Sequence, residues 1–126
     1  MGLDMYAWVV PSERVIDDLT FKSTEEEQPE QLFYWRKHHD LHGWMTKLYE
    51  SKGGQGEFNC KTVRLTAEDL FQLEIDVREN RLPSTTGFFF GNNPPDADSI
   101  ARDLEFIRSA IKAISSGDAV YYDSWW

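Results

Sequence analysis

The spacing of hydrophobic and polar residues changes several times along this chain, and each change marks a predicted element. Leu3 to Val10 alternates loosely and stops at Pro11, which predicts a first strand. Gln31 to Arg36 has the composition of a second, short strand. From Asp40 the period becomes helical, and the apolar residues on one predicted face are Leu41, Trp44, Met45, Leu48 and Tyr49.

The second half of the chain alternates in the same way between strand-like and helix-like segments. Thr66 and Asp69 stand at the spacing of a capping box, so a helix is expected to begin there. The further predicted elements are a strand at 58–65, this helix through about residue 79, a strand at 86–91, a helix with apolar residues in register from Ile100 to Ile114, and a last strand at 119–125.

This order of elements predicts an α+β fold, or a small α/β fold. About five short strands are expected to form one sheet, with three helices packed mainly on one of its faces. A length of 126 residues fits one domain, residues 1–126. The glutamate-rich segment around 22–30 is expected to be a mobile acidic loop within it.

The charge balance changes which partners are expected. The chain has 22 Asp and Glu against 13 Lys and Arg, a net charge of −9, which disfavours direct binding to nucleic acid. Such acidity keeps an aromatic-rich protein in solution, or it presents a surface to a basic protein partner. No apolar run approaches the ~20 residues that span a bilayer, and the lone Cys60 suits a reducing compartment. We therefore expect a cytoplasmic protein without a membrane contact.

The segment from Phe33 to Met45 is the strongest candidate for a binding site. It contains all three histidines and two of the five tryptophans. Trp35, Arg36 and Lys37 lie where a strand is expected to pass into a helix, and the free N–H groups of a helix N-terminus attract anions. The alternative leaves Trp35 anchored in the core, with Arg36 and Lys37 on the surface.

Catalytic and metal-binding patterns are weak. His38 and His42 have the spacing of two zinc ligands on a helix, but the glutamate of a zinc-protease motif is missing and the sequence has no pair of cysteines. Neither a phosphate-binding glycine loop nor a nucleophile elbow occurs. We expect no metal and no cofactor, and a nucleotide-directed enzyme using Asp4 or His42 as its base is the least supported hypothesis.

Four strings in the sequence resemble a widespread, largely uncharacterised family of small phage and prophage proteins. They are MGLDMY at the start, YWRK with LHGW in the middle, LPSTTGFFFG from Leu82, and YYDSW near the end. The resemblance covers nearly the whole chain and implies an accessory phage-type protein of the bacterial host cell. The signature residues that it implies are Asp4, Tyr34, Trp35, Arg36, Lys37, His42, Phe88, Phe89, Phe90, Tyr122 and Trp125.

These signature residues are polar and aromatic together, which suits a pocket better than a core. The sequence therefore predicts a protein that binds, without turnover, a small anionic aromatic ligand such as a nucleotide or a nucleotide-derived signal, in order to counter a host defence. The alternative is an acidic inhibitor or nucleic-acid mimic that binds a host protein. The C-terminal aromatics leave a homodimer open. The predicted ligand-binding residues are Trp35, Arg36, Lys37, His42, Phe89 and Tyr122.

Overall fold

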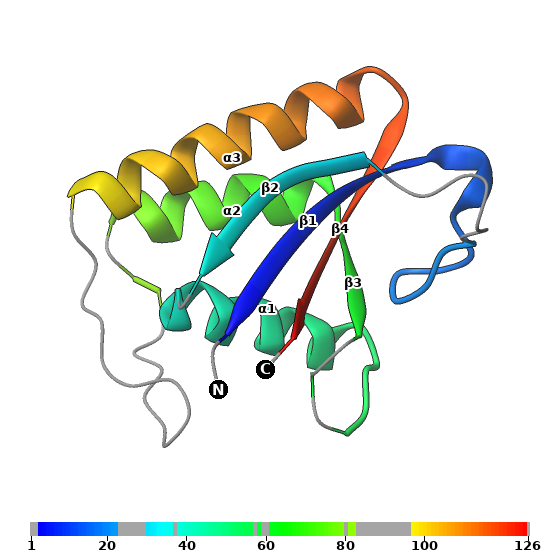
Figure 1. Cartoon of the computed structure of the whole chain (residues 1–126), viewed down its shortest axis with the longest axis horizontal. Helices are drawn as coiled ribbons and strands as arrows, with labels where there is room; N and C mark the ends of the chain where they lie inside the picture. Colours follow the sequence, from blue (N-terminus) through cyan, green and yellow to red (C-terminus); the bar gives the residue numbers. More distant parts are fainter. Residues whose placement is uncertain are drawn as a thin grey trace.

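The computed structural model contains a four-stranded sheet and three α-helices (Figure 1). It describes residues 3–22, 30–36, 38–56, 58, 61–79, 81–82 and 97–125. In chain order the elements are β1 (Asp4–Pro11), a 3₁₀ turn (Ser12–Arg14), β2 (Glu30–Arg36), α1 (His39–Ser51), β3 (Thr62–Leu65), α2 (Ala67–Arg78), α3 (Ala97–Ser115) and β4 (Asp118–Trp125).

The two strands nearest the chain ends pair with each other at the centre of the sheet. The strand order is β2-β1-β4-β3, and every neighbouring pair is antiparallel. β1 and β4 are paired along their whole length, from Asp4 opposite Trp125 to Pro11 opposite Asp118. The sheet is therefore complete only when the last strand has joined the first.

The three helices lie behind one face of the sheet, which we call the inner face (Figure 1). Strand alternation turns Met5 and Ala7 of β1 inward, where both are buried, and turns Tyr6 and Trp8 to the opposite, outer face. The core between the sheet and the helices contains, among others, Leu3, Leu41, Met45, Val63, Leu65, Leu70, Leu73, Phe106, Ile107 and Val120.

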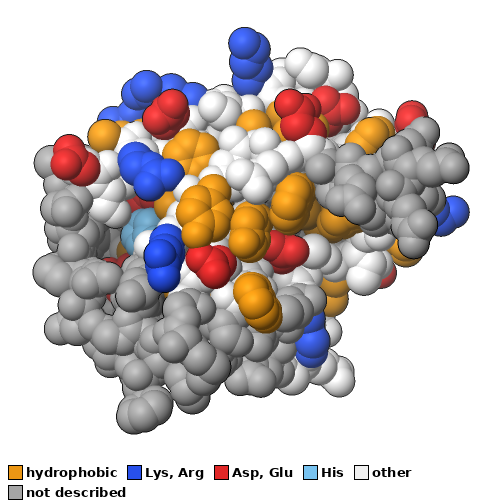
Figure 2. Space-filling view, viewed as in Figure 1, with side chains coloured by type: hydrophobic (Ala, Val, Ile, Leu, Met, Phe, Trp, Pro, Cys, Tyr) orange, Lys and Arg blue, Asp and Glu red, His pale blue; other side chains and the backbone are white. Residues whose placement is uncertain are grey.

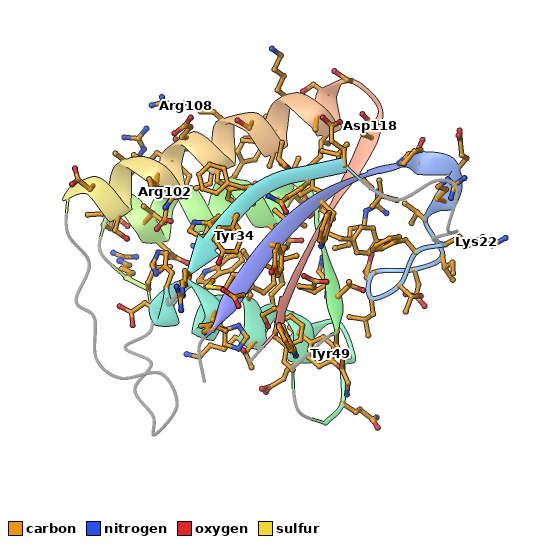
Figure 3. The ribbon with its side chains drawn as sticks, in the orientation of Figure 1. Lys22, Tyr34, Tyr49, Arg102, Arg108 and Asp118 are labelled. Atoms are coloured by element: carbon orange, nitrogen blue, oxygen red, sulfur yellow. The ribbon has the colours of Figure 1, made fainter. Side chains whose placement is uncertain are left out.

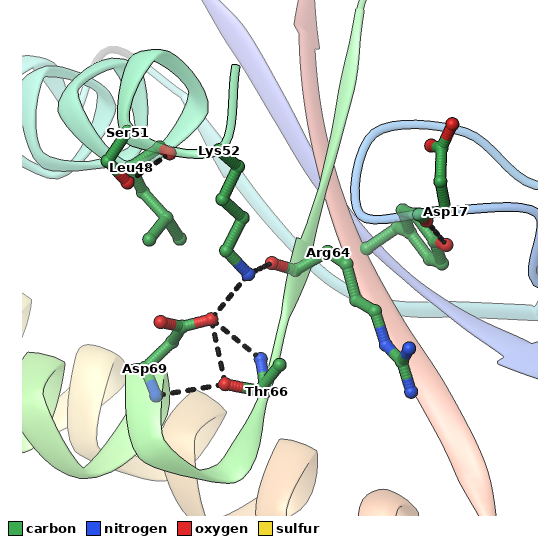
Figure 4. Close-up of polar contacts among 8 residues, drawn as sticks. Asp17, Leu48, Ser51, Lys52, Arg64, Thr66 and Asp69 are labelled. Atoms are coloured by element: carbon green, nitrogen blue, oxygen red, sulfur yellow. Dashed lines mark hydrogen bonds and ion pairs between the residues drawn. The ribbon is translucent and has the colours of Figure 1, made fainter. Parts of the chain in front are cut away.

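Lys52 connects α1 to β3 and to α2 by hydrogen bonds (Figure 4). The Lys52 ammonium, at the end of α1, donates to the carbonyl oxygen of Arg64 and to Oδ2 of Asp69, both at 2.6 Å. Asp69 and Thr66 also form the expected capping box, in which each side chain binds the other's backbone N–H. Because one carboxylate serves both roles, the start of α2 is fixed against the two elements that precede it.

Each edge of the sheet has features that hinder the addition of another strand. On β2 the register shifts by a bulge near Leu32, and Arg102 of α3 donates to the carbonyl oxygen of Tyr34 at 2.7 Å (Figure 3). On β3, the backbone N–H of Arg64 donates to the carbonyl oxygen of Asp18 at 2.7 Å. Bulges and bonded edge groups disfavour the addition of another chain to a sheet.

The α+β prediction is confirmed, with corrections to the number of strands and to the start of β3. The sheet has four strands in the part of the chain that the structure describes, and not about five. The predicted strand at 86–91 lies outside the described residues, as does most of the acidic loop predicted at 22–30. The strand predicted at 58–65 begins only at Thr62, because β3 pairs with β4 no further than Asp123.

Asp69→Asn should lower the free energy of unfolding by about 1–2 kcal/mol at neutral pH, because it removes the charge that Lys52 contacts. Burial raises the pKa of Asp69, but the hydrogen bonds from Lys52 and Thr66 outweigh it and hold the pKa below its ordinary value of 3.8. A carboxyl group with a lowered pKa stabilises the fold above its unfolded pKa and loses that contribution as the pH falls through its folded pKa.

Urea unfolding of the wild type and the variant, from neutral pH to about pH 3, measures the difference in their free energies of unfolding at each pH. The difference between the two should be largest at neutral pH and shrink below about pH 4. Glu68→Gln, at an exposed position of the same helical turn, is the matched control. A difference that does not depend on pH would contradict the assignment.

Candidate functional site

Three of the predicted site residues meet, but they do so in the core. Nδ1 of His42 lies 2.9 Å from the hydroxyl of Tyr122, and the rings of Trp35 and Tyr122 are 6.4 Å apart. The His42 ring also stacks on Phe58, with centroids at 5.6 Å and planes 7° apart. All of these side chains are buried. Burial raises the pKa of the Tyr122 hydroxyl well above its ordinary value.

The Trp35 side chain has no free face for a ligand to stack on. It is 2% exposed, and it packs against Phe33 and, edge-on, against Phe106. Its indole N–H donates to Oδ1 of Asp103 at 3.2 Å. The other oxygen of Asp103 lies 2.7 Å from Nε2 of His38. The Trp35 corner is thus a buried hydrogen-bonded cluster of an indole, a carboxylate and an imidazole.

The predicted cations do not join this cluster in the described structure. Arg36 follows Trp35 on β2, so strand alternation turns it to the outer face, where it is exposed and pairs across the sheet with Asp4. Lys37 and Phe89 lie outside the described residues. Arg36 is therefore separated from His42 and Tyr122 by the sheet itself. Binding of an anionic aromatic ligand at this corner stays a prediction.

The outer face of the sheet carries a row of aromatic side chains. Tyr6 and Trp8 stack at 5.6 Å with planes 19° apart, and Tyr6 meets Tyr34 of β2 at 5.3 Å. Tyr34 is 37% exposed, and Trp125, opposite Asp4 on β4, is 63% exposed. Figure 2 shows hydrophobic side chains in a row across this face, with acidic side chains beside them. We call Tyr6, Trp8, Tyr34 and Trp125 the aromatic row.

Two carboxylates belong to the same surface. The Tyr34 hydroxyl donates to Oδ1 of Asp4 at 2.6 Å, and this hydrogen bond raises the pKa of Tyr34. Asp123 of β4 lies opposite Tyr6, in the middle of the sheet. Burial raises the pKa of Asp123, while a hydrogen bond from the nearby Trp8 side chain opposes that shift. The row therefore presents aromatic rings together with acidic groups.

The other end of the outer face is covered by the segment that follows β1. Phe21 packs against Tyr121 at 4.7 Å, and the Tyr121 hydroxyl donates to the carbonyl oxygens of Thr20 at 3.0 Å and of Asp17. With Val10, Ala119 and Val15 these residues form a second, smaller core. Only the end of the face that carries the aromatic row is left open by the described residues.

A shallow groove between α1 and α2 is a second candidate site. It has a volume of about 370 Å³ and is lined by Trp44, Lys47, Leu48, Ser51, Asp76 and Arg81. The Trp44 indole N–H donates to Oδ2 of Asp76 at 2.8 Å, which positions the indole in this groove. An aromatic ring beside an ammonium and a guanidinium suits a small anion.

The comparisons with known proteins do not identify a known site, and the described side chains do not form one that is recognisable. No family model, curated protein or solved structure matches this chain, so the resemblance to phage proteins stays a prediction. Among the described residues, no group of three His, Cys, Asp or Glu side chains could hold a metal ion. None of the helices described is both long and apolar enough to cross a bilayer.

Two features of the site were missed from the sequence, although each left a signal. Asp103 lies between Ile100 and Ile107 on the apolar stripe of the last helix, and a carboxylate at such a buried position requires a hydrogen-bonding partner. Tyr6 and Trp8 have the same strand parity, opposite to the buried Met5 and Ala7. That pattern predicts aromatic side chains on the face of a strand that points away from the core.

Asp103→Asn should lower the free energy of unfolding by about 2–4 kcal/mol, since it removes a buried charge that both His38 and Trp35 contact. Glu105→Gln, at an exposed position of the same helix, should change it by no more than about 0.5 kcal/mol. Urea unfolding followed by tryptophan fluorescence compares the two. Equal stability of the two variants would show that Asp103 does not hold the core together, and it would return the Trp35 corner to consideration as a ligand site.

Proposed function

We propose that this chain is a binding protein without catalytic activity, and that the open end of its outer sheet face binds a protein partner. One observation carries the proposal: aromatic rings and carboxylates share a sheet face that no described helix covers. A large apolar patch on a protein surface commonly marks an interaction site. Tyrosine and tryptophan are also the residues most often responsible for binding energy at interfaces.

The charge of this face favours a protein over a nucleic acid. Aromatic residues on an open antiparallel sheet can stack on unpaired bases, and such surfaces bind RNA in other folds. Those surfaces need several cations for the phosphates, whereas this face places Asp4 and Asp123 among the rings, with Arg36 opposite Asp4, and belongs to a chain of net charge −9. A polypeptide with apolar and basic side chains complements it better.

The placement of the histidines supports binding over turnover. His42 contacts Tyr122 inside the core, and the His38 side chain, 12% exposed, contacts the buried Asp103. Both rings are thus used to hold elements of the fold together. Together with the resemblance to phage proteins, this makes a protein of the bacterial host the expected partner, with inhibition or counter-defence as the biological role.

A small anionic ligand is the second candidate, and the groove between α1 and α2 is the observation that favours it. The groove places Lys47 and Arg81 near the Trp44 ring. The ligand chemistry is the one expected from the sequence, but the site lies in the helix layer and not at Trp35 of β2.

The double variant Tyr6→Thr/Tyr34→Thr tests the main proposal, because threonine keeps strand propensity while removing two rings of the aromatic row. The matched control is Phe71→Gln/Ile75→Gln, which removes two exposed apolar side chains from α2. Immobilised wild-type and variant proteins are exposed to a bacterial lysate, and a captured protein is then purified and titrated. We expect the outer-face variant to lose binding by at least about tenfold and the α2 variant to retain it. The opposite pattern would reject the outer face as the site.

A thermal-shift screen with nucleotides and inorganic phosphate tests the second candidate. A ligand at a hundredfold excess over its Kd stabilises the fold by about 2.7 kcal/mol, which raises Tm by several degrees. In the variant Lys47→Gln/Arg81→Gln the shift should disappear, while the exposed Lys112→Gln on α3 should keep it. A shift that survives the loss of both groove cations would place the ligand elsewhere.

A further inference from the structure

Asp123 occupies the middle of the outer face. On β4 it lies opposite Tyr6 of β1 on one side and opposite Thr62 of β3 on the other. The Thr62 hydroxyl donates to the carbonyl oxygen of Leu19 at 2.5 Å, so its proton is not available to the carboxylate. The Tyr6 ring, with Trp8 stacked on it, borders Asp123 on the side of the aromatic row.

Asp123 takes part in none of the ion pairs among the described residues, and Arg64, the nearest cation along β3, lies opposite Tyr121 instead. The Trp8 side chain hydrogen-bonds to the Asp123 carboxyl group, but its Oδ1 atom has no hydrogen-bond partner in the described structure. Burial is also the main cause of its raised pKa. Asp4 differs, because it accepts from Tyr34 and lies across from Arg36. A carboxylate that is partly removed from water attracts a cation more strongly than one in bulk solvent.

We propose that Asp123, with the rings of Tyr6 and Trp8, is the point at which the outer face receives an arginine side chain of its protein partner. This inference rests on the proposed function and names the chemistry of the partner. A guanidinium group fits the site better than an ammonium group. It is planar, it stacks on aromatic rings, it pairs with carboxylates through several N–H groups, and it is less strongly hydrated.

The surroundings of Asp123 suit the rest of such a partner. The exposed rings of Tyr34 and Trp125 give the residues beside the arginine apolar surface to contact. The net charge of −9 attracts a basic segment from a distance and raises its association rate. The bulge in β2 and the bonded backbone groups at both edges disfavour strand addition, so contact through side chains on the face is the favoured mode of binding.

NMR titration of the full chain with N-acetyl-arginine amide tests the inference, and the indole N–H signals serve as reporters. N-acetyl-citrulline amide, which has nearly the same shape without the charge, is the control probe. We expect arginine to shift the Trp8 indole signal and to leave the buried Trp35 signal unchanged, and citrulline to shift neither. Asp123→Asn should weaken the arginine response at least about tenfold, as expected for a charge-assisted contact. Asp118→Asn, which removes the same charge at the start of β4, should retain it.

The outcomes separate this inference from the proposed function. If arginine and citrulline shift the Trp8 signal equally, or neither shifts it, the arginine site is rejected, and this comparison does not depend on the folding of any variant. The outer face still stands as a protein-binding surface if Tyr6→Thr/Tyr34→Thr loses the captured protein. If that variant also binds normally, both proposals are rejected.

Discussion

The antiparallel pairing of β1 with β4 is the interaction on which the rest of this fold depends. It joins residues far apart in the sequence and provides the two central strands, so it unites the β1–β2 pair and the β3–β4 pair in one sheet. Such long-range pairing carries a large loop-closure entropy, and it tends to make folding slow. During synthesis β1 can pair with β2 early, but the four-stranded sheet cannot form until β4 is available.

Polar side chains within the core fix how the helices sit on this sheet. His42 connects α1 to β4 through Tyr122, and Asp103 connects α3 to Trp35 of β2 and to His38 at the start of α1. Each contact joins elements that are far apart in the sequence. Apolar contacts are not directional, so they do little to fix the position of a helix on a sheet. A buried polar group that loses its partner, by contrast, costs about 1–3 kcal/mol. These contacts within the core explain the polar residues at these positions without a ligand.

The sequence was sufficient for the fold class and most elements, because periodicity, capping and the Gly and Pro breaks are local signals. Thr66 and Asp69 form the capping box predicted from their spacing alone. The strand order could not be predicted, since it depends on pairing across the whole chain. The site was harder still. Trp35, His42 and Tyr122 do meet, yet the sequence could not tell a polar cluster in a core from one in a pocket, because both place aromatic and titratable residues together. Arg36 directly follows Trp35 on β2, and strand alternation therefore places their side chains on opposite faces of the sheet.

The hindered edges of the sheet have a consequence for any partner that binds the outer face as proposed. Addition of a strand to an open edge relies on main-chain hydrogen bonds, which almost any extended sequence can supply. The bulge in β2, the Arg102 contact and the turn beside β3 disfavour that mode of binding here. Whatever lies on the outer face is held by side chains, so recognition depends on a few identities in the partner. A partner under selection to escape could therefore do so by a single amino-acid replacement, and an accessory protein of this design would have to change with it.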